Sequence, residues 1–143
     1  PPRLHQDHRE VVVRAGEVLV ARTVRAIRVL ETASPPTFYI PLTDIVPGML
    51  MPAAGASFCE WKGRARYWSV RAGDNTVERA AWSYPDPAPA FEVIRDAVAF
   101  YAHCLACTVN GERVRPQPGG FYGGWITDDI VGPFKGDPGT SGW

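Results

Sequence analysis

The chain has few of the segments that mark the most easily recognised protein classes. It contains three cysteines in 143 residues, and a small odd number argues against a disulfide framework. No run approaches the roughly 18 apolar residues that a membrane-spanning helix needs. The first ten residues, PPRLHQDHRE, are polar and lack the apolar core of a signal peptide. We therefore expect a cytoplasmic protein that contacts no membrane.

An excess of charge of one sign is also absent. Fifteen Lys and Arg residues balance fifteen Asp and Glu residues, so the formal net charge is zero. Proteins that bind nucleic acid usually carry a basic excess, and we expect no nucleic-acid partner. The phosphate loops G-x-x-x-x-G-K-[ST] and G-x-G-x-x-G and the zinc motif H-E-x-x-H are missing too, and we expect no cofactor.

The rest of the sequence has the hydrophobic content and patterning of a single folded domain. Hydrophobic residues make up 45% of the chain, and a chain of this length can bury roughly 68% of its unfolded surface. We predict a mainly β (α+β) fold, in which a small, twisted antiparallel sheet of hairpins carries one packed helix. Residues 1–116 form this domain, and residues 117–143 form a strap rich in glycine, proline and aromatic residues.

β-Branched residues and turn signals predict the hairpins. The first hairpin turns at residues 15–17, and its second arm runs as a long strand to Glu31. A helix is the rival for residues 20–31, but Val24, Ile27 and Val29 favour the strand. Further strands are predicted at 38–40, at 64–72 and 76–84 around a second turn, and on both sides of Asn110-Gly111. Residues 44–57 are expected to form a loop with one helical turn at 49–51.

The two main hairpins share a sequence repeat. VRAGEVLVAR at 13–22 aligns without gaps with VRAGDNTVER at 70–79, and six of the ten residues are identical. The match indicates either convergence on a good hairpin turn or duplication of a β unit. Both interpretations place the sheet at the core of the protein.

The segment DPAPAFEVIRDAVAFYAH, residues 86–103, has the pattern of a helix. Asp86 suits the N-cap and Pro87 the first helical position. Apolar residues recur at i, i+3, i+7 and i+10, which makes one stripe that would cover a face of the sheet. They are Phe91, Ile94, Val98 and Tyr101.

The tail QPGGFYGGWITDDIVGPFKGDPGTSGW combines glycine and proline with aromatic residues that a disordered linker would lack. We expect a strap that lays these anchors on its own body or on a second subunit. Because exposed apolar patches of that extent are unusual on monomers, and two-fold dimers are the commonest oligomer, we predict a homodimer with contacts from 117–143. The anchors are Phe121, Tyr122, Trp125, Ile126, Phe134 and Trp143.

The cysteines offer two kinds of chemistry. Cys104 and Cys107 form a C-x-x-C pair beside His103, but neither a strand nor a continued helix provides the turn of a zinc knuckle, so we expect no metal. Cys59 precedes Lys62 and Arg64, which would favour a thiolate nucleophile. The alternative is a structural thiol that lines a pocket, because free cysteine is among the most buried residue types.

Acids and aromatic residues surround the same segment, FCEWKGRARYWSV at 58–70. Glu31 and Asp44 follow predicted strands, and the ends of strands commonly carry functional groups on a rigid scaffold. Lys62 would point inward against Glu31 or Asp44. Trp68 and Trp82 would line a flat pocket or fill the core.

Four motifs in order, VLETASPPTFYIPLTDI, CEWKGRARYWSV, AAWSYPDPAP and VAFY, resemble domain-of-unknown-function family 427 over about residues 9–103. This family carries a nucleotidyltransferase-like label. The resemblance implies a small, mainly β domain with no established reaction or cofactor, and the FYGGWITDDIVGPFKG tail is similar to an extension found in one branch. Its motif residues are Glu31, Tyr39, Pro41, Asp44, Cys59, Lys62, Gly63, Tyr67, Trp82, Tyr84, Pro85 and Tyr101.

Two functions follow as hypotheses. The first is a small-molecule-binding domain that could also act as an enzyme, with an unidentified small molecule as its partner. The rival is a structural or protein-interaction module without catalysis. The candidate catalytic residues are Glu31, Asp44, Cys59 and Lys62, and the candidate ligand-binding residues are Tyr39, Tyr67, Trp82, Tyr84 and Tyr101.

Overall fold

The computed structural model describes residues 2–137 and 140, and these fold almost entirely as antiparallel strands. The strands are β1 (Arg3–Asp7), β2 (Val11–Ala15), β3 (Val18–Thr23), β4 (Ala26–Leu30), β5 (Thr37–Pro41), β6 (Leu50–Cys59), β7 (Gly63–Ala72), β8 (Asn75–Ser83), β9 (Ala97–Phe100), β10 (Ala106–Val109), β11 (Glu112–Arg113), β12 (Arg115–Pro116) and β13 (Trp125–Ile126). Two short 3₁₀ helices, η1 (Leu42–Asp44) and η2 (Pro89–Ile94), complete the elements of the described residues. No helix in this part of the chain is long and apolar enough to cross a membrane.

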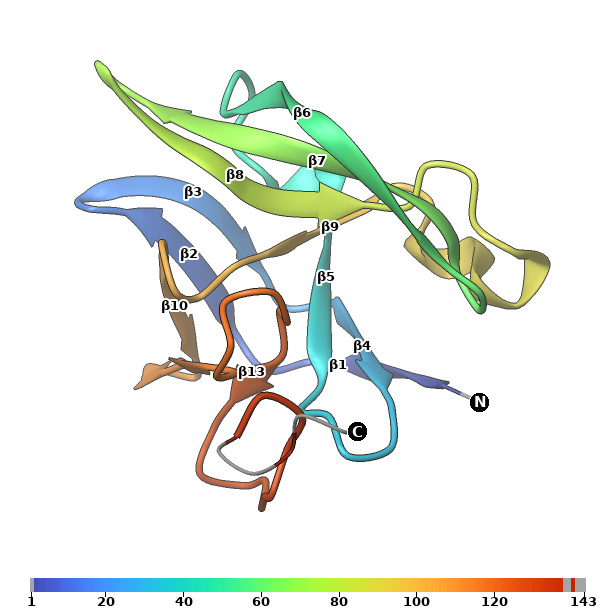
Figure 1. Cartoon of the computed structure of the whole chain (residues 1–143). Coiled ribbons are helices and arrows are strands. Elements are labelled where there is room, and N and C mark those ends of the chain that lie inside the picture. The colour runs from blue at the N-terminus through green and yellow to red at the C-terminus, as the bar shows by residue number, and fades with distance from the viewer. Residues whose placement is uncertain (1, 138–139, 141–143) are drawn as a thin grey trace.

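The strands form one large and two small sheets. The seven-stranded sheet has the order β1-β4-β5-β9-β8-β7-β6, and the four-stranded sheet has the order β11-β10-β2-β3. β12 and β13 pair by themselves. Figure 1 shows β6, β7 and β8 across the top of the molecule, the β2–β3 hairpin to one side and the C-terminal segment at the bottom. The prediction of a mainly β fold built from antiparallel hairpins is confirmed.

The predicted hairpins at both repeated segments are also confirmed. β2 and β3 turn at Gly16-Glu17 with Ala15 opposite Val18, and β7 and β8 turn at Gly73-Asp74 with Ala72 opposite Asn75. Gly16 and Gly73 have φ of +59° and +62°, which glycine adopts at little cost. The repeat thus marks two equivalent turns in two different sheets.

The long strand predicted from residue 18 to Glu31 is wrong, because the chain changes sheet at Val24-Arg25. β3 belongs to the four-stranded sheet and β4 to the seven-stranded one. The Thr23 hydroxyl accepts a hydrogen bond from the Arg25 amide at 3.0 Å, a local turn that interrupts the ladder. The helical turn expected at 49–51 is wrong as well, because Leu50 and Met51 belong to the edge strand β6 and Met49 directly precedes it.

The helix predicted over residues 86–103 is the largest error. Only Pro89–Ile94 are helical, as a 3₁₀ segment, and Ala97–Phe100 form strand β9 between β5 and β8. All four residues of β9 are buried, because a central strand is covered on both faces and loses the polar alternation of a half-exposed strand. Val98 and Tyr101, which the helical stripe placed together, lie in different apolar clusters.

The two faces of the seven-stranded sheet carry separate clusters. One face packs against the four-stranded sheet through aliphatic residues such as Val13, Val20 and Ile40. The other face carries Tyr39, Tyr67, Trp82, Tyr84 and Tyr101, and it is covered in part by η2 through Phe91 and Ile94. η2 therefore takes over the covering role expected of the helix.

The C-terminal strap folds back on its own chain over the residues that the structure describes. Trp125 is 1% exposed and stacks on Phe38 with ring centroids 4.9 Å apart. Its amide bonds to the Pro36 carbonyl at 2.8 Å, and the Lys135 amide bonds to the Ala33 carbonyl at 2.9 Å. Trp125 and Phe134 thus need no second subunit to cover them, whereas the predicted anchor Trp143 lies outside the described residues.

Candidate functional site

A row of aromatic residues crosses four neighbouring strands of the large sheet. Tyr39 on β5 and Trp82 on β8 both pair with Ala99 on β9, and Tyr67 on β7 pairs with Trp82. Residues directly opposite each other in antiparallel strands point to the same face, so these side chains stand together. Ala99 stands between two large aromatic neighbours and is itself buried, with 1% exposure.

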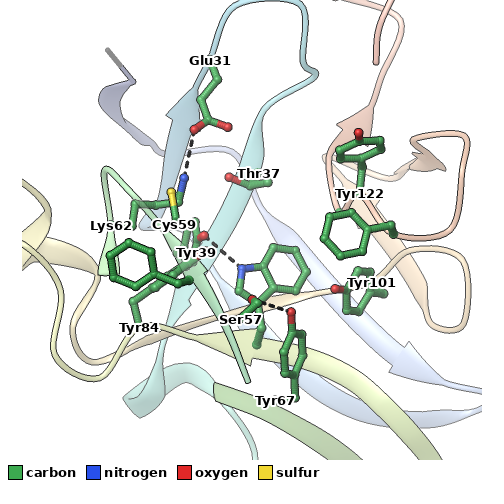
Figure 2. Close-up of a pocket in the computed structure, with 14 residues that line it drawn as sticks. Glu31, Thr37, Tyr39, Ser57, Cys59, Lys62, Tyr67, Tyr84, Tyr101 and Tyr122 are labelled. Atoms are coloured by element: carbon green, nitrogen blue, oxygen red, sulfur yellow. Dashed lines mark hydrogen bonds and ion pairs between the residues drawn. The ribbon is translucent and has the colours of Figure 1, made fainter. Parts of the chain in front are cut away.

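The aromatic residues of the row form one wall of a cavity of about 320 Å³, which lies between the sheet, the β6–β7 turn and the strap. Figure 2 shows Glu31 and Lys62 at one end of it and Tyr101 and Tyr122 at the other. Eight of the nine predicted site residues line it, and Asp44 alone does not. The lining residues are Glu31, Thr37, Tyr39, Ser57, Phe58, Cys59, Lys62, Tyr67, Trp82, Tyr84, Tyr101, Phe121, Tyr122 and Gly123.

Hydrogen bonds fix most of the aromatic wall. The Trp82 indole Nε1 donates to the Tyr39 hydroxyl at 3.1 Å, and the Tyr67 and Ser57 hydroxyls lie 2.8 Å apart. The Tyr84 side chain is buried, with 7% exposure, and its hydroxyl has no hydrogen-bond partner within the described chain. The oxygen is not among the fully buried unpaired atoms of the described chain, so it stays accessible at the cavity that Tyr84 lines and is a candidate contact for a ligand.

The phenols of the wall stay protonated at neutral pH. Burial raises the pKa of Tyr39 and of Tyr84 far above the usual value. Burial, with the nearby Tyr67 as a second cause, raises the pKa of Tyr101 to about 12. Each of these groups can therefore donate as well as accept a hydrogen bond.

A lysine and a glutamate form the charged end of the cavity. The Lys62 side chain is 7% exposed, and its Nζ donates to the Glu31 Oε1 at 3.0 Å. Nζ also lies 5.8 Å from the ring centroid of Tyr84 and 5.9 Å from that of Phe91, close enough for cation–π attraction. The expected inward-pointing lysine thus pairs with Glu31 and not with Asp44.

The β6–β7 turn holds Lys62 in place. Gly63 has φ of +111°, and a Cβ there would lie 3.2 Å from the Asp86 carbonyl oxygen. The Ala88 amide bonds to the Lys62 carbonyl at 3.0 Å. Only glycine suits this combination of backbone angle and close approach, which accounts for the Lys62-Gly63 pair in the sequence.

Asp44 has a different role. Its carboxylate accepts hydrogen bonds from the Thr23 hydroxyl at 2.7 Å and from Arg25 Nε at 3.1 Å. The hydrogen bond from Arg25 and then that from Thr23 lower the pKa of Asp44. It therefore ties η1 to the turn between β3 and β4, away from the cavity. Trp68 also lies outside the cavity lining, where its Nε1 donates to the Ser83 hydroxyl at 2.9 Å.

Two further hollows adjoin the cavity. One shares Tyr67, Tyr101 and Phe121 with it and adds Arg79 and His103. The other shares Glu31 and Cys59 and adds Glu60, Trp61 and Lys135. The three together make an extended groove with aromatic walls in the middle and charged side chains at both ends.

Sequence reasoning missed the wall that the strap contributes. A Cβ on Gly123 would lie 2.1 Å from the Trp82 ring, and one on Gly124 would lie 2.4 Å from Pro35. The FYGG segment thus crosses the aromatic row at a distance that only glycine permits. The sequence does indicate a close approach here, because two adjacent glycines follow two aromatic residues. It does not indicate that the residue approached is Trp82.

The cysteines occupy three different environments. Cys59 lines the cavity and is partly exposed. Burial raises the pKa of Cys104, and burial raises the pKa of Cys107 to about 12. Among residues 2–137 and 140, no group of three or more His, Cys, Asp and Glu side chains is arranged to hold a metal ion.

The chain belongs to the family described as a domain of unknown function (DUF427), whose model, NTP_transf_9, matches residues 3–114. The match confirms the resemblance seen in the motifs. It contains every strand of the two larger sheets and all the cavity-lining residues except Phe121, Tyr122 and Gly123. No curated protein matches the chain.

Proposed function

We propose that this DUF427 protein binds a small organic molecule that carries a flat ring and a polar group. The observation that carries the proposal is a cavity with aromatic walls that ends in an ion pair between the buried Lys62 and the half-buried Glu31. Ligand pockets of this kind are mostly apolar, with a few convergent polar groups that fix orientation. The volume of about 320 Å³ lies at the lower end of the range for organic ligands.

The energetics of Lys62 support a binding role over a purely structural one. Removing an ammonium group from water costs several kcal/mol, and one ion pair rarely repays that cost. An apolar side chain of similar volume would stabilise the fold as well or better. Lys62 has three N–H donors, and Glu31 is its one hydrogen-bonding partner among the described side chains. The remaining donors are available to a ligand.

A thermal-shift screen with aromatic acids, amines, amino acids and nucleosides tests the proposal. A compound at a hundred times its Kd should add about 2.7 kcal/mol to the free energy of unfolding.

The cysteines provide a second measurement without mutation, because Cys59 lines the cavity and Cys104 does not. A bound compound at that concentration should slow iodoacetamide labelling of Cys59 by more than about tenfold, with Cys104 as the internal control. If no compound in the screen changes either measurement, the proposal is wrong.

A protein-interaction module is the second candidate, supported by exposed aromatic residues around the mouth of the groove. Phe58 is 76% exposed, Phe121 69%, Trp61 45% and Tyr122 37%. Aromatic side chains are enriched at interfaces and often act as their anchors. A second copy of this chain would be the partner, in a homodimer with contacts from residues 117–143.

Light scattering at micromolar concentration tests the homodimer. We expect twice the 15.7 kDa chain mass and a shift to monomer when Phe121 and Tyr122 are both replaced by serine. A monomeric parent protein would exclude the homodimer. A dimer that persists in the double variant would place its interface elsewhere.

A further inference from the structure

The charged end of the cavity can bind both a positively and a negatively charged group of a ligand. Glu31 uses Oε1 for the bond to Lys62 and is 35% exposed, so its second oxygen can accept from a ligand. Lys62 retains donors that Glu31 does not occupy. The other lining residues include no Asp, Glu, Lys, Arg or His. The formal charge of the lining therefore sums to zero.

A pocket of zero net charge whose anion and cation form a single contact pair, each with unused hydrogen-bonding capacity, favours one kind of ligand. A simple carboxylate would bind Lys62 but place a second negative group beside Glu31. A simple amine would bind Glu31 but lie beside the Lys62 ammonium. Like charges at such distances repel, and the repulsion grows as the ligand excludes water. A ligand with both charges leaves neither side chain unmatched.

We infer that the cavity accepts a zwitterion with a flat ring, of the class of the aromatic α-amino acids. This inference rests on the proposed binding function and specifies its ligand. The ligand carboxylate accepts from Lys62 and from the unpaired Tyr84 hydroxyl, and the ligand ammonium donates to Glu31. The ring lies against Tyr39, Trp82 and Tyr101, which line the cavity.

The test compares compounds that differ by one charge. Isothermal titration of the full chain is done with L-tryptophan, with tryptamine, which lacks the carboxylate, and with indole-3-propionate, which lacks the ammonium. L-Phenylalanine, phenethylamine and 3-phenylpropionate form the second set. In at least one set we expect the amino acid to bind more than about tenfold tighter than both of its analogues, a difference of about 1.4 kcal/mol. An analogue that equals or exceeds its amino acid in both sets overturns the inference.

Two variants test whether the preference for a zwitterion depends on the Lys62–Glu31 ion pair. Glu31→Gln should reduce the affinity for the amino acid to that for its deaminated analogue and leave the analogue's own affinity unchanged or higher. Glu92→Gln is the matched control, because Glu92 forms an exposed pair with Arg95 at 2.7 Å, outside the cavity. If Glu31→Gln and Glu92→Gln leave the preference for the zwitterion equally intact, the inference is wrong.

Cys59 labelling of the unmutated chain separates this inference from the proposed function. Protection of Cys59 by the amino acid, and not by its two analogues, supports both. Protection by some other screened compound, with no protection by either amino acid, overturns the zwitterion and retains the binding function. No protection by any compound overturns both.

Discussion

The two faces of the seven-stranded sheet are built from different side chains for different purposes. The face toward the four-stranded sheet is mainly aliphatic, with Phe38, Phe100 and Trp125 as the aromatic residues of its buried cluster, and we call it the aliphatic face. The opposite face carries four tyrosines and a tryptophan in its buried cluster, with the Lys62 ammonium beside two of its rings. The four-stranded sheet and Trp125 of the strap close the first face, and η2 and the FYGG segment of the strap cover the second. We therefore expect the first face to supply most of the stability and, under the proposed function, the second face to supply the binding site.

The largest effect is expected on the aliphatic face. Phe38→Ala removes a ring that is 1% exposed and stacked on Trp125, and it leaves a cavity that neighbours fill only in part. We expect a loss of about 3–5 kcal/mol in the free energy of unfolding, measured by urea denaturation. A loss below about 1 kcal/mol, typical of surface sites, would show that this face is not the main source of stability.

A second large effect is expected where the strap and β1 meet β4. Asp7 is 5% exposed, and its carboxylate binds Arg9 at 2.6 Å and Arg28 at 3.2 Å, while Arg9 also lies 3.6 Å from Asp129 on the strap. Burial opposes ionisation of Asp7, but the hydrogen bonds and charges of Arg9 and then the charge of Arg28 outweigh it and lower the pKa. Asp7→Asn should cost about 2–3 kcal/mol at neutral pH.

The pH dependence of this cost follows from the sign of the pKa change. Because the folded pKa lies below the unfolded value of about 3.9, ionised Asp7 stabilises the fold above that pH. The stabilisation is lost as the pH falls through the folded pKa. Urea midpoints of the parent chain and of Asp7→Asn should therefore converge between neutral pH and about pH 2. A difference that stays constant over this range would exclude ionisation as its source.

The accuracy of sequence reasoning differs between the two faces for a physical reason. Hairpin turns are local, and Gly16, Gly73 and Asn110-Gly111 predict them because their backbone angles require those residues. Strand β9 is set by non-local pairing with β5 and β8, which overrides the helical pattern of its segment. The change of sheet at Thr23–Arg25 depends in part on Asp44, twenty-one residues from Thr23, and no local pattern encodes it.

The proximity of the candidate residues to one another was predicted better than the topology around them. Glu31, Cys59, Lys62 and the five aromatic residues line one cavity, because their motifs, given by the family resemblance, each lie at a strand end or on one sheet face. Asp44 was misplaced because an acid after a strand is equally suited to a local turn. The strap residues Phe121–Gly123 were missed because contact with Trp82 depends on the path of the folded chain.

Gly123→Ala tests how the strap closes the aromatic face. The new Cβ would lie 2.1 Å from the Trp82 ring, so the strap or the ring must move. Overpacking of this kind costs about 1–3 kcal/mol, and the Trp82 indole N–H signal should shift in the NMR spectrum. Gly132→Ala is the control, because its Cβ would lie 3.3 Å from Phe134, a far milder contact. Equal effects of the two variants would contradict a specific role for Gly123 over the cavity.

The smallest effects on the free energy of unfolding are expected from removing two hydroxyls of the aromatic face, those of Tyr39 and Tyr84. The two effects should differ clearly from each other. The Tyr39 hydroxyl accepts from Trp82 Nε1 at 3.1 Å, so Tyr39→Phe leaves that buried N–H unpaired and should cost about 1–2 kcal/mol. The Tyr84 hydroxyl has no partner among the described residues and is not fully buried, so Tyr84→Phe breaks no hydrogen bond and should change the free energy of unfolding by less than about 0.5 kcal/mol.

The Tyr84 hydroxyl makes no hydrogen bond within the described chain and is not fully buried, and Tyr84 lines the cavity. It can therefore bond a ligand without first breaking a hydrogen bond of the fold. Tyr84→Phe should therefore leave the free energy of unfolding nearly unchanged and weaken the binding of any carboxylate ligand by roughly tenfold. Urea denaturation and titration calorimetry measure the two quantities on the same sample. A stability loss as large as that of Tyr39→Phe, with unchanged ligand affinity, would identify Tyr84 as part of the core and remove the distinction between the faces at this position.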